Sequence, residues 1–252
     1  MLYRSFGQPH GNPSKSQTPQ AGSMQSSWTS SVECRFAHAH EATQPVDLYY
    51  SAFLPRNYTE AYAYPLLAYL HDKDSFDQRL NDWFPAISDQ NYVGIGVRAP
   101  FPHLRGYPGQ FRWKLNRPDS SLATVRDTIS HACNHWNIHG GRICLFGEGD
   151  GGIVALQHLI LQASNAQQLV PANGIICKSL PAGWGKWLPP IPDTLSGRIL
   201  FLDENLGAQE QAALDALDEA GVSVTCQQVE SGQQPASLVN HWIMSGISTA
   251  IF

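Results

Sequence analysis

The chain has 252 residues, of which 42% are hydrophobic, and a net charge of −5 at pH 7. This length and composition allow a single domain with a substantial core. Lysine and arginine number 16 against 21 aspartate and glutamate residues, without any sizeable basic cluster. This balance argues against nucleic acid or an anionic membrane as partner. No apolar run reaches the roughly 18 residues that a membrane span needs.

Residues 1–30 are rich in Ser, Gln, Pro and Gly. Such a segment buries too little apolar surface to offset its ordering entropy, so we predict a disordered tail followed by one folded domain over residues 31–252. The N-terminus lacks the positive-then-apolar pattern of a secretion signal. The five cysteines are scattered and odd in number, as is typical of free thiols in a reducing compartment. We therefore expect a cytoplasmic protein.

Strand-like and helix-like segments alternate from residue 31 onward. Apolar or alternating runs predict strands at Val32–His38, Val46–Leu54, Pro65–His71, Tyr92–Val97, Arg142–Phe146, Gly174–Leu180, Arg198–Asp203 and Ser223–Val229. Helical spacing predicts helices at Phe76–Asp89, Ser121–Trp136, Gly152–Gln162, Ala208–Ala220 and Ala236–Ile251. Ser121 is the expected N-cap of the second helix and Gly221 the expected stop after the fourth. The order predicts a mostly parallel sheet between layers of helices.

The most informative motif lies at residues 142–152, Arg-Ile-Cys-Leu-Phe-Gly-Glu-Gly-Asp-Gly-Gly. An apolar strand runs into closely spaced glycines, and a helix-compatible run follows. A Gly-x-Ser-x-Gly turn of this kind holds the nucleophilic serine of many hydrolases. Here the frame places Gly149 at the serine position, so the turn is kept and the attacking atom is absent.

This order of elements resembles the α/β-hydrolase fold over about residues 45–250. The closest resemblance is to the phospholipase/carboxylesterase group of serine esterases. The motifs that carry it are Leu70-His71, residues 136–143, Gly151-Gly152, residues 220–224 and Asn240-His241-Trp242-Ile243. The resemblance implies a mostly parallel central sheet flanked by helices on both faces, and esterase ancestry. We expect no cofactor and no bound metal.

Ester hydrolysis in such enzymes needs a nucleophile, a histidine base, a carboxylate and N–H groups that bind the oxyanion. The resemblance places these roles at Gly149, at Gln233, near Asp203 and Leu206, and at His71-Asp72 with the backbone of Asp150. Neither glycine nor glutamine can do the required chemistry, and a carboxylate would repel an oxyanion. We expect a pseudoenzyme that has lost serine-esterase activity and binds a small ligand or a protein partner. A homo-oligomer and a purely structural subunit remain compatible with the sequence.

Asp150 offers an alternative nucleophile, because some members of the fold form an ester on an aspartate at this turn. A one-residue slip would place it between Gly149 and Gly151, but would put Glu148 where a small residue is needed. An acid at the first turn of a helix is also favourable without catalysis. The alternative is therefore an active hydrolase that uses Asp150.

Several histidines fall on predicted helices. His131, Cys133, His135 and His139 cluster in sequence, yet no glutamate follows the first histidine as in zinc proteases. We expect them, and His241 on the last helix, to be structural.

Two loops that leave carboxyl ends of strands are expected to line a pocket. The pocket residues predicted from them are His103, Arg105, Phe111, Trp113 and Trp184, with Trp187 as a further candidate. A surface loop that packs its own aromatic rings would explain the same residues. A ligand binder would keep the pocket open, whereas a structural subunit would fill it.

Overall fold

The computed structural model describes residues 30–36, 46–103, 109–164, 168–202, 207–229 and 235–249. An eight-stranded sheet has the order β1-β2-β4-β3-β7-β8-β9-β10. Its strands are β1 (Ser30–Phe36), β2 (Val46–Phe53), β3 (Tyr64–Leu70), β4 (Val93–Val97), β7 (Ile138–Glu148), β8 (Gly174–Lys178), β9 (Arg198–Leu202) and β10 (Ser223–Gln227). β2 pairs antiparallel with β1 and β4, and all other neighbours in this sheet are parallel. A small hairpin of β5 (Phe101–Pro102) and β6 (Phe111–Arg112) stands apart.

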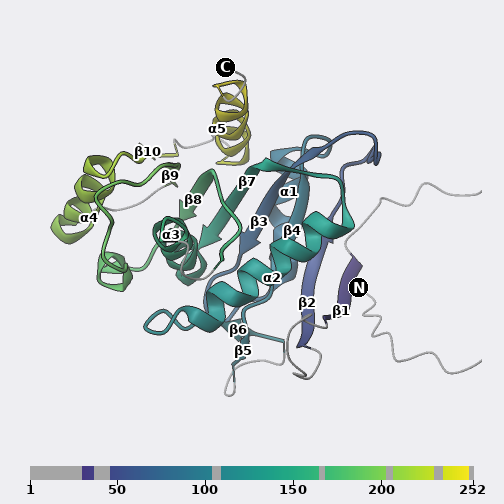
Figure 1. The fold of residues 1–252 in the computed structure, drawn as a ribbon, viewed down its shortest axis with the longest axis horizontal. Helices are drawn as coiled ribbons and strands as arrows, with labels where there is room; N and C mark the ends of the chain where they lie inside the picture. The colour runs from purple at the N-terminus through teal and green to yellow at the C-terminus, as the bar shows by residue number, and fades with distance from the viewer. Residues whose placement is uncertain are drawn as a thin grey trace, which may run out of the picture.

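Helices cover both faces of the sheet, as Figure 1 shows. The helices are α1 (Leu80–Ile87), α2 (Asp119–His135), α3 (Asp150–Gln162), α4 (Ala208–Glu219) and α5 (Pro235–Thr249), with short 3-10 turns η1 (Asp77–Arg79) and η2 (Trp184–Trp187). One core cluster contains apolar residues of α2, α3 and α4, and a second contains those of α1 and α5. The predicted mostly parallel sheet with helices on both faces is confirmed.

β3 explains why the central strands are continuously apolar. Its side chains alternate between the two clusters, with Leu66, Ala68 and Leu70 in the first and Leu67 and Tyr69 in the second. Because strand side chains point to opposite faces in turn, a strand covered on both sides needs apolar residues at every position.

Three expected boundaries need correction. The segment predicted as one helix over Phe76–Asp89 is the 3-10 turn η1 followed by α1, which begins at Leu80. α2 begins at Asp119, and Ser121 is a buried residue inside the helix whose Oγ accepts the N–H of Lys114 at 3.1 Å. Ser121 is therefore no N-cap. β7 begins at Ile138, four residues before the predicted Arg142, because Ile138 pairs with Tyr64 of β3 before a shift in register.

The predicted stop after α4 is confirmed by Gly221, which has φ +102 and donates its N–H to the carbonyl of Asp218. The predicted tail lies outside the described residues except for Ser30, the first residue of β1. Within the described part of the chain, no helix is long and apolar enough to cross a membrane.

Candidate functional site

Gly149 lies at the turn between β7 and α3, as the sequence predicts. Its φ of 52° and ψ of −123° fall in a region that side-chain-bearing residues rarely adopt. The neighbouring glycines allow close backbone contact. A Cβ on Gly147 would meet the backbone of Gly152, and one on Gly151 would meet the carbonyl of Leu70. The helix is thereby seated directly on β7 and β3.

Asp72 fills the space above this turn. Its Oδ1 accepts the backbone N–H of Lys73 at 2.7 Å and that of Asp150 at 3.0 Å. A Cβ built on Gly149 would overlap the same carboxylate. The resemblance predicts an oxyanion hole at His71-Asp72 and the backbone of Asp150. Oδ1 of Asp72 already accepts two backbone N–H groups there, those of Lys73 and Asp150.

His71 fixes the loop that carries Asp72. Its Nε2 accepts the N–H of Ala99 at 3.1 Å, so the ring proton lies on Nδ1, which donates to the carbonyl of Asp72 at 2.6 Å. Burial lowers the pKa of His71 to about 4. The neutral ring thus has both nitrogens engaged by the backbone and is a positioning group.

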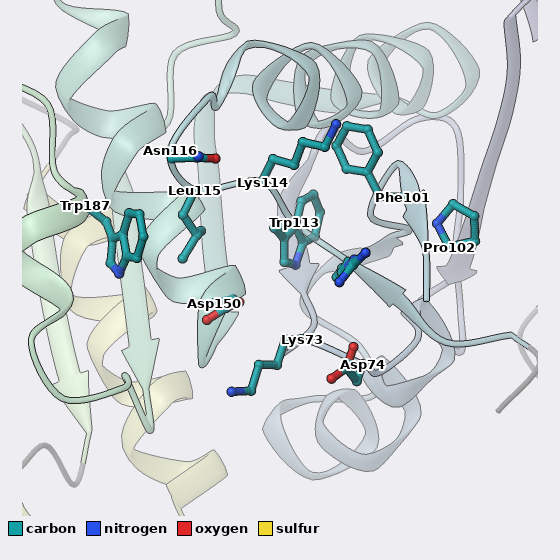
Figure 2. A pocket seen from close by; sticks show the side chains of 11 residues that line it. Lys73, Asp74, Phe101, Pro102, Trp113, Lys114, Leu115, Asn116, Asp150 and Trp187 are labelled. Carbon is teal, nitrogen blue, oxygen red and sulfur yellow. The ribbon is translucent and has the colours of Figure 1, made fainter. Parts of the chain in front are cut away.

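Asp150 is the first residue of α3 and points toward the pocket (Figure 2). Burial raises its pKa above the usual range, and the nearby carboxylate of Asp72 raises it further, while Lys73 opposes the shift. Two acids therefore stand close together at the start of this helix.

Glu148 belongs to a separate polar group on the other face of the sheet. Its Oε2 accepts the hydroxyl of Tyr69 at 2.5 Å, and its Oε1 lies 3.6 Å from Nζ of Lys178. Burial, and then Glu148, raise the pKa of Tyr69. Since Tyr69 packs in the cluster under α1 and α5, Glu148 is held away from α3.

A pocket of about 630 Å³ lies beside Asp150 (Figure 2). Its lining comes from the loop after β3, the β5–β6 hairpin with the segment that follows it, and η2: Lys73, Asp74, Phe101, Pro102, Arg112, Trp113, Lys114, Leu115, Asn116, Asp150 and Trp187. Gln157 of α3 joins two of these walls. Its Nε2 donates to the carbonyls of Leu115 at 2.9 Å and Trp187 at 2.7 Å.

Only some of the residues predicted for the pocket line it in the structure. Trp113 lines the wall and donates its Nε1–H to the carbonyl of His71 at 2.7 Å, and Trp187 lines the pocket as well. Trp184 is 2% exposed and stacks on Phe201 in the core. It does not line this pocket.

Of the remaining predicted pocket residues, Phe111 packs against the guanidinium of Arg98, and Nδ1 of His103 lies 3.2 Å from Oδ1 of Asp74. Arg105 lies outside the described residues. Five residues that line the pocket were not predicted from the sequence: Lys73, Asp74, Lys114, Leu115 and Asn116. They lie within three residues of Asp72 or Trp113 in the sequence, and this proximity is the signal that could have indicated them.

The expected acid and base positions, Asp203, Leu206 and Gln233, also lie outside the described residues, so their roles stay predictions. His131 and His135 stack with their ring centroids 5.7 Å apart on α2, and His241 is exposed on α5. In the part of the chain that the structure covers, no three potential metal-binding side chains gather.

Comparison with known proteins identifies the fold. No family model and no curated protein matches the sequence. Among solved structures, a carboxylesterase from Mesorhizobium loti has a TM-score of 0.56 at 16% identity, covering 78% of this chain and 94% of its own. A lipase/esterase from Lactobacillus plantarum gives 0.56 at 12% identity, with 87% and 98% covered. A carboxylesterase from Bacillus cereus gives 0.52 at 14% identity, with 72% and 88% covered.

Proposed function

The chain has the α/β-hydrolase fold of these esterases, and we propose that it no longer hydrolyses esters and binds a small ligand in the pocket beside Asp150. One observation carries the proposal. The carboxylate of Asp72 covers Gly149 and accepts the N–H groups of Lys73 and Asp150. Position 149 therefore supplies no attacking atom, and the two N–H groups beside it are already bonded to Asp72.

The surroundings of the turn support the loss of ester chemistry. A serine attacks only when a base takes its proton, and Gly149 has no side chain to activate. His71 is the histidine beside Asp72, but its Nε2 already accepts a backbone N–H. A developing oxyanion would also meet the charge of Asp72, so the electrostatic contribution that dominates acyl transfer is reversed.

The pocket supports a binding role over a purely structural one. Its volume of about 630 Å³ lies within the range of small-molecule sites, and aromatic and charged side chains share its lining. A subunit with only an assembly role would have no reason to keep this space open. Cys133, Cys144, Cys177 and Cys226 are free thiols, which supports a cytoplasmic location as part of the proposal.

A second candidate function is hydrolysis through Asp150. Its carboxyl group lines the pocket, in the position from which an aspartate could attack a bound substrate. Its raised pKa and the neighbouring Asp72 both disfavour the ionised form that attack requires.

Hydrolysis of p-nitrophenyl acetate and butyrate by the purified protein separates the two candidates. We expect a rate no greater than that of a buffer and heat-inactivated control. Turnover that an Asp150→Asn variant abolishes would establish Asp150 as the nucleophile. Turnover that survives in this variant and in an Asp72→Asn variant would show that another residue carries the reaction, and would overturn the proposal.

A further inference from the structure

The pocket beside Asp150 is lined by both charged and aromatic side chains. We infer that it binds an organic anion with a flat apolar body, of the aryl carboxylate class. The inference deepens the proposed ligand-binding function and rests on it. Three features support it: unpaired cations at the wall, aromatic rings between them and η2, and acids that exclude an anion from the start of α3.

Five charged side chains line the pocket. The acids are Asp74 and Asp150, and the cations are Lys73, Arg112 and Lys114. Asp74 lies beside His103, and Lys73 acts electrostatically on Asp150. Within the described ranges, no carboxylate lies within 4.0 Å of the charged nitrogens of Lys73, Arg112 or Lys114. Lys73 stands near the carboxyl group of Asp150, which it favours in the ionised form, whereas Arg112 and Lys114 are available to a ligand at the other wall.

Aromatic side chains line the pocket between the wall that carries Lys114 and the wall formed by η2. Figure 2 shows Trp113 between Phe101 with Lys114 on one side and Leu115 with Trp187 on the other. Nζ of Lys114 lies 3.8 Å from the ring centroid of Phe101, so this ring holds the ammonium group at the wall. A flat apolar body would pack on Trp113 and Leu115 while its acidic group faces Lys114 and Arg112.

The acids fix the orientation of such a ligand. The N–H groups of Lys73 and Asp150 are taken by Asp72, so they cannot bind the acidic group of the ligand. The carboxyl group of Asp150 would repel it when ionised. An anion is thereby directed to Arg112 and Lys114, the opposite of the placement that an ester carbonyl would take in an active esterase.

Isothermal titration calorimetry with 1-naphthoate and its neutral analogue 1-naphthamide tests the inference on the full-length protein. We expect 1-naphthoate to bind and 1-naphthamide to bind more weakly. The paired change Arg112→Gln with Lys114→Gln should weaken naphthoate binding roughly fivefold, since exposed charge contacts contribute modestly, and should leave amide binding unchanged. Arg117→Gln is the matched control, because Arg117 is an exposed arginine of the same segment that does not line the pocket.

Equal binding of acid and amide by the wild-type protein would overturn the inference, as would binding of neither. Arg117→Gln removes one charge, so it is compared with Arg112→Gln and Lys114→Gln made singly. An effect of Arg117→Gln as large as that of either single change would also overturn the inference, since net charge alone would then explain the loss. Thermal unfolding of each variant checks that the fold is intact. Ester turnover would overturn the proposed function by a separate measurement and would leave the naphthoate result to stand on its own.

Discussion

Oδ1 of Asp72 accepts a hydrogen bond from the backbone N–H of Asp150 at 3.0 Å, and the same carboxylate occupies the space that a Cβ on Gly149 would need. A side chain at position 149 and the carboxylate at position 72 therefore compete for one volume. A serine at position 149 would have to displace the carboxylate of Asp72 from its hydrogen bonds with Lys73 and Asp150.

Gly149→Ser should destabilise the protein by at least about 2 kcal/mol, because serine is strained at positive φ and its Cβ overlaps Asp72. Asp72→Gly should cost about 1–3 kcal/mol, since it leaves the N–H groups of Lys73 and Asp150 without this acceptor. Urea unfolding of the double variant should give a loss smaller than the sum by about 1–2 kcal/mol. Strict additivity would show that the two positions do not compete.

Ester hydrolysis should not return with Gly149→Ser alone, because the sequence places Gln233 where the base is expected. Gly149→Ser with Gln233→His should hydrolyse p-nitrophenyl acetate faster than either single variant, since triad members act as a unit. Adding Asp72→Gly should raise the rate again by freeing the two N–H groups. Robust cleavage by Gly149→Ser alone would mean that a histidine is already in place, with His103 or His241 the first to examine.

The pKa of Asp150 should fall in an Asp72→Asn variant, because the neighbouring charge that raises it is removed. It should remain above the usual range, since burial is the larger cause. Lys73→Gln should shift the pKa of Asp150 upward, because Lys73 lowers it. Carboxyl ¹³C NMR titration measures all three proteins, and shifts of the same sign in both variants would contradict the assignment.

Folding stability should decrease as the pH falls from about 6.5 to about 4, in part because of His71. Its pKa is about 4 in the folded protein against the model-peptide value of 6.5, so the unfolded chain binds the proton first. The contribution is complete above pH 6.5 and is lost progressively toward pH 4, up to about 3 kcal/mol. In His71→Gln, urea unfolding between these pH values should show a shallower dependence. An unchanged slope would mean that other groups account for the whole decrease.

Gln157→Ala should weaken binding of 1-naphthoate as well as stability, because Gln157 ties the carbonyls of Leu115 and Trp187 across the pocket. The control is Gln162→Ala in the same helix, where the side-chain amide bonds only the backbone of Ala172. Each variant should lose about 1–3 kcal/mol of stability. Only Gln157→Ala should change the affinity for 1-naphthoate in calorimetry. If Gln157→Ala and Gln162→Ala bind 1-naphthoate equally well, Gln157 does not shape the binding site.

The sequence was sufficient for the sheet, because strands such as β3 must be apolar at every position when both faces are covered. It also placed Gly149 correctly, since closely spaced glycines between an apolar strand and a helix indicate this turn. It gave the wrong role to Ser121, because the bond from Lys114 that uses its hydroxyl depends on how a distant loop returns to the helix. Trp184 lies in the core and Trp187 lines the pocket, although they are only three residues apart. The sequence could not distinguish them, because their surroundings also depend on how distant segments pack.

The sequence predicted the charge of Asp72 near the turn but not its hydrogen bonds. A charged residue beside the expected oxyanion hole predicts repulsion, but the bonds from Lys73 and Asp150 depend on backbone direction, which tertiary structure sets. His71 provides that direction through Ala99, a contact between segments 28 residues apart.

The glycines at 147 and 151 have a further consequence. Their hydrogens face the backbone of Gly152 and of Leu70, so any larger residue would push α3 off the sheet whether or not a reaction takes place. A protein of this fold that abandons catalysis is still obliged to keep this spacing in order to fold. The glycine pattern around this turn therefore reports how α3 packs on the sheet, and it would be the same with a glycine or a serine at position 149.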